Sequence, residues 1–148
     1  EVDGIGLLNI ETTFGKEKTT CQIEGEVNGE WVNRLIGESH KNLKGYEIHM
    51  GTSSGDIGLF KLRRLSSNSS LIPDGSINCN CWGTYIHGIF ENDSFRRGII
   101  NSIREQGELP PVDSAIKYSE MKEKAIDNLA DIVKQNLDMN FINRIIGL

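Results

Sequence analysis

The chain has 148 residues, of which 37% are hydrophobic and 25% charged, a composition typical of a folded single-domain protein and unlike that of disordered chains. No apolar run approaches the roughly 18 residues that a membrane-spanning helix needs, and no charged-then-apolar N-terminal stretch indicates a signal peptide. The formal net charge of −5 comes without a dense basic cluster, which argues against nucleic acid or an anionic membrane as a partner.

The first half of the chain has the pattern of strands. Residues 4–8 read as ordered core that leads into further strand residues. Polar and apolar side chains alternate strictly over residues 19–27, which places on one face Cys21, Ile23 and Val27. Asn28-Gly29 favours a type I′ turn, so a β-hairpin with a return strand over residues 31–36 is expected. Further strands are predicted over residues 46–50 and 58–63.

The second half begins with turns and strands. A serine-rich loop, residues 66–70, leads to the turn Pro73-Asp74-Gly75. Alternation then predicts a strand over residues 77–81, with Ile77 and both cysteines of that segment on one face. A second strand is expected over residues 84–87.

Helices are predicted for the rest of the chain. Asp93 or Ser94 can cap a helix that ends near Gly107. A longer helix starts near Ser119, and its apolar stripe consists of Ile126, Leu129, Ala130, Val133 and Leu137. A short helix over residues 139–146 is expected to end at Gly147. Strands followed by packed helices favour an α/β or α+β fold.

The histidines are the first candidates for chemistry. His87 ends a predicted strand and precedes Gly88, and an imidazole there suits proton transfer, although a hydrogen bond that caps the strand is the alternative. Strand alternation puts Glu47 and His49 on one face, where they either orient each other for catalysis or form a structural polar pair. His40 lies in a polar stretch and is expected to be a solvated loop residue.

The cysteines argue against metal binding. Cys79 and Cys81 have C-x-C spacing, and no second pair completes a tetrahedral site with His87. Together with Cys21 they are predicted to be unbridged side chains on the core faces of strands, and so low a cysteine count favours a reducing, cytoplasmic setting. Residues 51–55 are rich in glycine and hydroxyl groups but open no helix, so they form only a weak phosphate-loop candidate.

Several motifs together point to one family. Residues 83–90, followed by Phe95-Arg96-Arg97, resemble the histidine motif of the cobyric acid synthase family, whose C-terminal domain is a class I, triad-type glutamine amidotransferase. Residues 45–51 are similar to a second signature of that family. Residues 4–8, with Thr12, Phe14, Lys18 and Thr19, resemble a third signature. Residues 129–131 and 136–138 resemble the family's C-terminal helix.

The resemblance implies a fold and an activity. It implies an α/β, class I glutamine amidotransferase-like (flavodoxin-like) sheet, of which residues 1–148 form only the C-terminal portion, with mixed or antiparallel strands and then helices. The family is an ATP-dependent amide ligase of cobalamin biosynthesis, in which this domain hydrolyses glutamine to ammonia. A separate N-terminal domain uses ATP and Mg²⁺ to activate side-chain carboxylates of a corrinoid substrate, cobyrinic acid a,c-diamide. No cofactor or metal is expected in the present fragment.

The resemblance also assigns a catalytic residue. The family's histidine corresponds to His87, whereas the cysteine nucleophile belongs to a glycine-rich elbow that would precede residue 1, so the fragment alone is expected to be inactive. Class I enzymes commonly carry G-x-x-x-H-P-E, but here Gly88 and Ile89 replace the Pro and the Glu. Glu91 could not simply substitute on a strand, which leaves Glu47, with His49 beside it, as an alternative orienting group.

The sequence leaves two alternative functions open and leads to two structural expectations. The related cobyrinate a,c-diamide synthase fits the motifs less well, and a non-catalytic fragment or assembly module is the alternative from another class. We expect the ring of His87 to face a cleft that the elbow would fill. Since central strands of such a sheet would be missing, the fragment is also predicted to self-associate.

Overall fold

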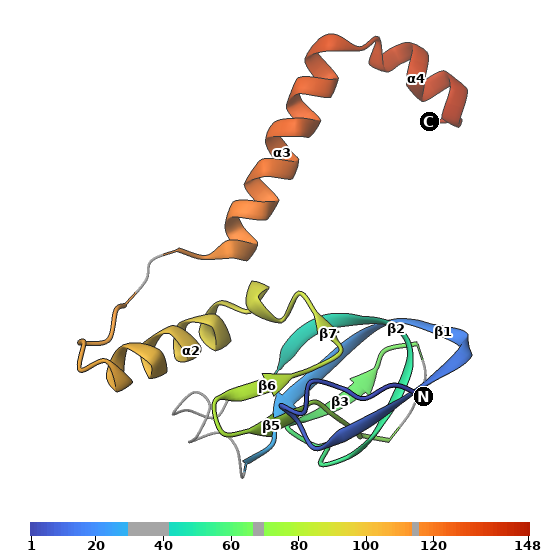
Figure 1. Cartoon of the computed structure of the whole chain (residues 1–148). Helices are drawn as coiled ribbons and strands as arrows, with labels where there is room; N and C mark the ends of the chain where they lie inside the picture. Colours follow the sequence, from blue (N-terminus) through green and yellow to red (C-terminus); the bar gives the residue numbers. More distant parts are fainter. Residues whose placement is uncertain (30–41, 67–69, 114–115) are drawn as a thin grey trace. The chain divides into compact units, whose positions relative to one another are not determined.

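A computed structural model describes residues 1–29, 42–66, 70–113 and 116–148, which divide into two compact units, 1–113 and 114–148 (Figure 1). The first unit contains seven described strands, a 3₁₀ turn and a helix: β1 (Ile10–Val27), β2 (Leu43–Gly55), β3 (Phe60–Arg64), β4 (Ile72–Asp74), β5 (Ser76–Asn78), β6 (Cys81–Gly83), β7 (Ile86–His87), η1 (Ile89–Glu91) and α2 (Asp93–Gln106). The second unit contains α3 (Tyr118–Asn136) and α4 (Met139–Ile146).

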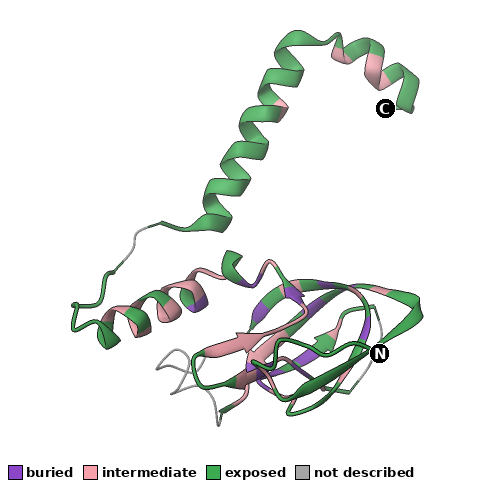
Figure 2. Ribbon diagram, in the orientation of Figure 1, coloured by how far each residue is buried: buried purple, intermediate pink, exposed green. Residues whose placement is uncertain are grey.

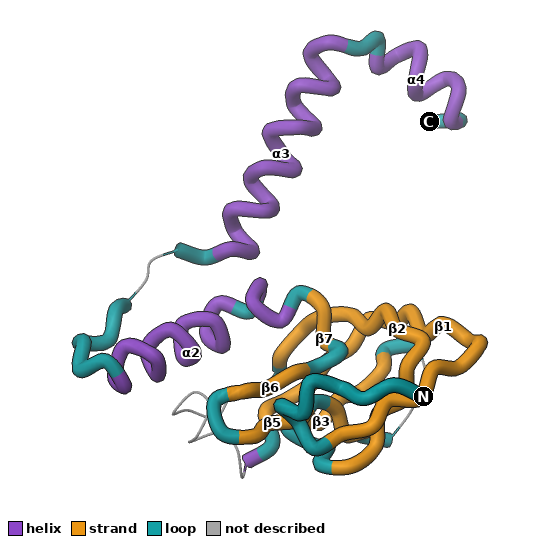
Figure 3. The backbone as a smooth tube through the Cα atoms, viewed as in Figure 1, coloured by secondary structure: helices purple, strands orange, loops and turns teal. Residues whose placement is uncertain are grey.

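The strands form one antiparallel sheet and one small hairpin. The five-stranded sheet has the order β4-β3-β1-β2-β7, and β5 pairs with β6. Figure 3 shows the strands in orange. Every pairing between described strands is antiparallel. The two longest strands, β1 and β2, pair over most of their length, with a shift where residues 15–18 lie opposite Met50 alone. This bulge bends the ladder close to the cavity described below.

One face of the sheet carries the core. The largest fully buried side chains among the described residues are Phe60, Phe95, Ile23, Leu43, Leu59 and Leu62, and burial of each contributes roughly 1.5–3 kcal/mol. Phe95, from α2, packs against the rings of Phe60 and Trp82, with both pairs of centroids 6.1 Å apart. Figure 2 shows the buried residues gathered in the sheet and at the start of α2.

The opposite face of the sheet is open. Tyr46, Ile48 and Met50 alternate with the buried residues of β2 and are each 38–45% exposed. Lys61 and Arg63 of β3 are also exposed on alternate positions. An uncovered strip of apolar side chains therefore runs along the outer face of β2.

Several predicted elements are confirmed. Cys21, Ile23 and Val27 are buried on one face of β1, as the alternation predicts. The helix predicted from Asp93 or Ser94 is α2, although Asn92 is its N-cap residue and Gly107 its C-cap. The side chain of Asn92 accepts a hydrogen bond from the Lys44 N–H and donates one to the Lys44 carbonyl. These two bonds connect the start of α2 to β2.

Other expectations are wrong or fall outside the described residues. Residues 4–8 form no strand and are not core, since Ile5 is 88% exposed and β1 begins only at Ile10. Cys79 has a positive φ of 52° in the turn between β5 and β6, so residues 77–81 form no continuous strand. The expected return strand over residues 31–36 lies outside the described residues; within them, the partners of β1 are β2 and β3.

The second unit consists of two amphipathic helices. The Asp138 carboxylate accepts a hydrogen bond from the Phe141 N–H at 3.0 Å and so caps α4, which ends at Gly147 in the left-handed region. The predicted stripe of α3 exists, but Leu129 is 61% exposed and no described residue of α3 or α4 is buried. Among the described helices, none is both long and apolar enough to cross a membrane.

Candidate functional site

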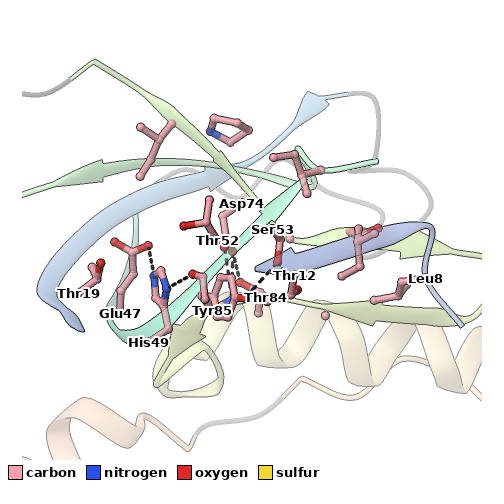
Figure 4. A pocket seen from close by; sticks show the side chains of 18 of the residues that line it. Leu8, Thr12, Thr19, Glu47, His49, Thr52, Ser53, Asp74, Thr84 and Tyr85 are labelled. Carbon is pink, nitrogen blue, oxygen red and sulfur yellow. Dashed lines mark hydrogen bonds and ion pairs between the residues drawn. The ribbon is translucent and has the colours of Figure 1, made fainter. Parts of the chain in front are cut away.

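A cavity of about 450 Å³ opens on the core-facing side of the sheet (Figure 4). Strands β1 to β4 contribute to its walls, together with Ser76 of β5 and residues 83–85. Its charged groups are Glu47, Arg64 and Asp74, and hydroxyl groups line much of the remaining surface. Because these groups come from segments far apart in the chain, the cavity is a product of the sheet register.

Glu47 is the buried centre of a polar cluster. The residue is 2% exposed. Its carboxylate accepts hydrogen bonds from Arg64 Nε at 2.6 Å and from Arg64 Nη2 at 3.2 Å. Burial by itself would raise the pKa of Glu47, but the hydrogen bonds from Arg64 and His49 outweigh it and hold that pKa below its usual value. The same bond to Glu47 raises the pKa of Arg64. The pair is therefore ionised.

His49 is fixed by both of its ring nitrogens. Nε2 lies 3.2 Å from the Glu47 carboxylate and Nδ1 lies 2.7 Å from the Gly51 carbonyl. The ring also stacks on Tyr85, with centroids 4.1 Å apart and planes 13° apart (Figure 4). The expectation that Glu47 and His49 share a face is confirmed, and the two side chains are within hydrogen-bonding distance of each other, as both a catalytic and a structural pair would be.

Hydroxyl groups continue this cluster across the cavity. The Tyr85 hydroxyl is 3.0 Å from Ser53 Oγ, which is 2.8 Å from Thr12 Oγ1. Residues 51–55, the weak phosphate-loop candidate, thus lie within β2 and do not form a loop, and residues 51–53 line the cavity.

Asp74 forms a second polar group in the cavity. The Thr84 hydroxyl donates a hydrogen bond to its carboxylate, and the Tyr85 N–H donates at 3.3 Å. Burial raises the pKa of Asp74 despite these bonds. Ser76, which follows Asp74 by two residues, is 3% exposed. Its Oγ has no hydrogen-bond partner among the described residues.

His87 lies on the other face of the sheet. It pairs directly with Tyr46 across β2 and β7, whereas Glu47 pairs with Ile86, so the side chains of Glu47 and His87 point to opposite faces. His87 is exposed at the end of β7, as predicted, and its ring stacks on Tyr46. The structure does not bring Glu47 or His49 to His87, because the strand period of two separates them.

The segment after His87 turns back on itself. Gly88 has a φ of +74°, and η1 follows it at once, closed by a hydrogen bond from the Glu91 N–H to the Gly88 carbonyl at 2.9 Å. A Cβ at Gly88 would lie 3.6 Å from Glu91 Oε1 and 3.6 Å from the Tyr46 ring. The carboxylate of Glu91 is therefore folded over the residue next to His87. Glu91 lies in η1 and not on a strand, because β7 ends at His87.

The cysteines are free and dispersed. Cys21 is buried, with Sγ 3.0 Å from Ser66 Oγ, whereas Cys81 is half-buried. The prediction that Cys79 faces the core is wrong, because the turn exposes it. Among the described residues, no group of three or more His, Cys, Asp or Glu side chains could hold a metal ion. His40 lies outside the described residues.

Sequence reasoning did not assign Arg64, Asp74, Ser76 or Tyr85 to a functional site, although all four line the cavity. Arg64 was not singled out, although its parity with Phe60 and Leu62 on β3 places it on the core face. Asp74 was read only as a turn residue, and Tyr85 only as part of the motif around His87. The alternation of side chains along β3 could have placed Arg64 on the core face. The positions of Asp74 and Tyr85 depend on contacts between strands, which the sequence does not display.

Comparisons with known proteins agree on one family. The CobB/CobQ-like glutamine amidotransferase domain matches residues 1–95. A cobyric acid synthase of Thermodesulfovibrio yellowstonii is 47% identical over 148 residues, which is 100% of this chain and 28% of the relative. Cobyric acid synthases of Clostridium botulinum (strain Langeland) and Thermoanaerobacter sp. are 44% and 39% identical, over 100% and 98% of this chain and 29% and 30% of the relatives. The chain thus spans less than a third of these relatives, and no solved structure matches it.

Proposed function

Because the chain belongs to the CobB/CobQ-like glutamine amidotransferase family, we propose that it is part of the glutaminase domain of a longer cytoplasmic amide ligase of cobalamin biosynthesis. Glutamine is hydrolysed to glutamate and ammonia, and ammonia amidates corrinoid side-chain carboxylates, taking adenosylcobyrinic acid a,c-diamide to cobyric acid. ATP and Mg²⁺ act in an N-terminal domain. The name cobyric acid synthase, which the similar proteins carry, supports this reaction over that of cobyrinate a,c-diamide synthase.

The placement of His87 is the observation that carries this proposal. Its imidazole is exposed at a strand end on the open face of the sheet, where a thiol from another segment can reach it. The imidazole takes the thiol proton, the thiolate attacks the amide carbon of glutamine, and the C–N bond breaks as His87 returns the proton to the leaving ammonia. Water, deprotonated by His87, then attacks the thioester, which releases glutamate and restores the thiol.

The nucleophile of this reaction is a cysteine outside the three in this chain. Cys21 pairs with Glu47 across β1 and β2 and therefore lies on the face opposite to His87. Cys79 and Cys81 belong to the β5–β6 hairpin. We assign the nucleophile to a glycine-rich elbow of the longer protein, and residues 1–148 to the part of the domain that carries the histidine.

Two residues replace the missing third member of the triad as positioning groups. The ring of Tyr46 stacks on His87, and η1 folds the Glu91 carboxylate over Gly88 beside that ring. Ile89, at the position of the usual Glu, is buried and holds the turn in the core. Glu91→Gln should lower kcat for glutamine hydrolysis while leaving KM for glutamine nearly unchanged.

Substitution of His87 in the full-length protein tests the proposal. His87→Ala should abolish glutamine-dependent amidation and leave ammonia-dependent amidation intact, because only ammonia release needs the imidazole. Loss of both activities would assign a structural role to His87 and contradict the proposal.

A second experiment addresses the nucleophile. Residues 1–148 alone should release no glutamate from glutamine above background, and the chain with its upstream segment restored should release it. Glutaminase activity in the isolated chain would contradict our assignment of the cysteine. Continued inactivity after restoration would favour a non-catalytic assembly module.

A further inference from the structure

The cavity contains a hydroxyl group, that of Ser76, which neither the described part of the fold nor the proposed glutaminase uses. It lies on the face of Glu47, whereas His87 lies on the other. Ser76 lines it, and the Ser76 hydroxyl is buried without a hydrogen-bond partner in the described parts of the chain. Native proteins rarely leave such a group unsatisfied, since this costs about 1–3 kcal/mol. An unpaired hydroxyl in a cavity wall is expected where a ligand supplies the partner.

Arg64 supplies a binding group for an anion. Its hydrogen bonds to Glu47 use Nε and one N–H of Nη2, which leaves further N–H donors of the guanidinium for another acceptor. The side chain is 33% exposed and lines the cavity. Because Glu47 already holds the guanidinium in place, a carboxylate would meet a fixed fork of donors.

Asp74 and the apolar walls define the remaining chemistry. The Asp74 carboxylate is buried beside Ser76 and contributes to the electrostatic environment of Arg64. It can accept a further hydrogen bond from an ammonium or hydroxyl group. The walls also include apolar side chains, from Leu8, Ile10, Ile57 and Ile72. The volume of about 450 Å³ is within the usual range of small-molecule sites.

We propose that this cavity binds a small carboxylic acid with an apolar body and an amino or hydroxyl group. The carboxylate bonds Arg64, the second polar group bonds Asp74 and Ser76, and the apolar body contacts the isoleucine side chains. The site is separate from His87 and does not rest on the proposed glutaminase function.

Calorimetric titration of residues 1–148 with four matched probes tests the site. L-Valine has the amino group, 2-hydroxyisovalerate the hydroxyl group and isovalerate neither, and L-valinamide lacks the carboxylate. Valine or its hydroxy analogue should bind at least tenfold more tightly than isovalerate and than valinamide. Binding of none of the probes, or equal binding of valinamide, would overturn the proposal. If Asp74→Asn weakens the binding of valine alone, the carboxylate of Asp74 pairs with an ammonium group. If it weakens that of 2-hydroxyisovalerate alone, the carboxylate accepts from a hydroxyl group, and if it weakens neither, the assignment of Asp74 is wrong.

Ser76→Ala separates a ligand-binding hydroxyl from a merely buried one. The variant should weaken the better probe about three- to tenfold and raise the melting temperature of the free chain, because an unpaired polar group is removed. The matched control is Ser94→Ala on the exposed face of α2, which should change neither quantity. Unchanged probe affinity in Ser76→Ala would refute the assignment, as would loss of binding in His87→Ala.

Discussion

The ring of Tyr46 lies against the ring of His87, with centroids 5.3 Å apart and planes at 11°. The two residues are direct partners across β2 and β7, so the stack is built by the sheet itself. Neighbouring side chains on the two strands, Glu47 and Ile86, point to the other face. The stack thus fixes the proposed catalytic imidazole on the open face of the sheet without any contact to the buried Glu47 cluster.

Removal of the Tyr46 ring should slow the proposed reaction. A stacked aromatic pair contributes about 0.5–1.5 kcal/mol, so Tyr46→Ala in the full-length protein should lower kcat for glutamine hydrolysis roughly two- to tenfold. Tyr46→Phe keeps the ring and should retain most of the activity. Steady-state glutaminase assays at saturating glutamine distinguish the variants, and equal losses in both would show that the hydroxyl group, not stacking, matters.

Gly45 holds β7 against β2. A Cβ at this position would lie 2.6 Å from the His87 carbonyl oxygen and 2.6 Å from Ile86 Cγ2, so the edge strand must move. Gly45→Ala should lower the free energy of unfolding by about 1–3 kcal/mol and should displace His87. Urea denaturation followed by circular dichroism gives the stability change. Gly4→Ala is the control, since no atom lies within 4 Å of that Cβ; an equal effect there would contradict the steric explanation.

Glu47 should make stability depend on pH. Its pKa in the folded chain is below the unfolded value, so its contribution is present above the unfolded pKa and is lost as the pH falls through the folded pKa. Asp74 acts in the opposite sense, because its raised pKa makes the ionised form unfavourable, and acid relieves this cost. Glu47→Gln should therefore destabilise the chain by about 1.5–3 kcal/mol at pH 7 and reduce the loss of stability below about pH 4.5.

The measurement for Glu47 is urea unfolding at a series of pH values between 7 and 3. Glu17→Gln, at an exposed position of β1, serves as the control and should leave the curve unchanged. If Glu47→Gln and the unaltered chain lose stability in parallel as the pH falls, the hydrogen bonds from Arg64 and His49 are not the source of the pH dependence.

The open face of the sheet should promote self-association of residues 1–148. Tyr46, Ile48 and Met50 expose an apolar strip there, and its burial against a second copy would contribute about 25 cal/mol per Å². Sedimentation equilibrium should show a mass that rises with concentration, and Ile48→Lys should shift the chain toward the monomer. A single species of about 16.5 kDa at high concentration would refute the prediction.

Local signals in the sequence determined much of the fold. The alternation over residues 19–27 predicted the buried face of β1, and Gly147 predicted the end of α4. These features depend on neighbouring residues and on a fixed period, which a single sequence displays. The motif around His87 likewise predicted its place at a strand end. The alternation over residues 77–81 also predicted a strand, but it did not reveal the turn at Cys79, whose positive φ interrupts that strand.

Only the tertiary structure decided which polar groups meet. Glu47 and Arg64 are 17 residues apart in the chain, and Asp74 meets Thr84 across 10. These contacts depend on the order and register of the strands. Order and register are in turn set by the joint burial of all the apolar side chains on the core face of the sheet. The same register places His49 with Tyr85 in the cavity and His87 with Tyr46 outside it. A shift of one residue would exchange the faces, so the separation of the two histidines follows from packing of the core.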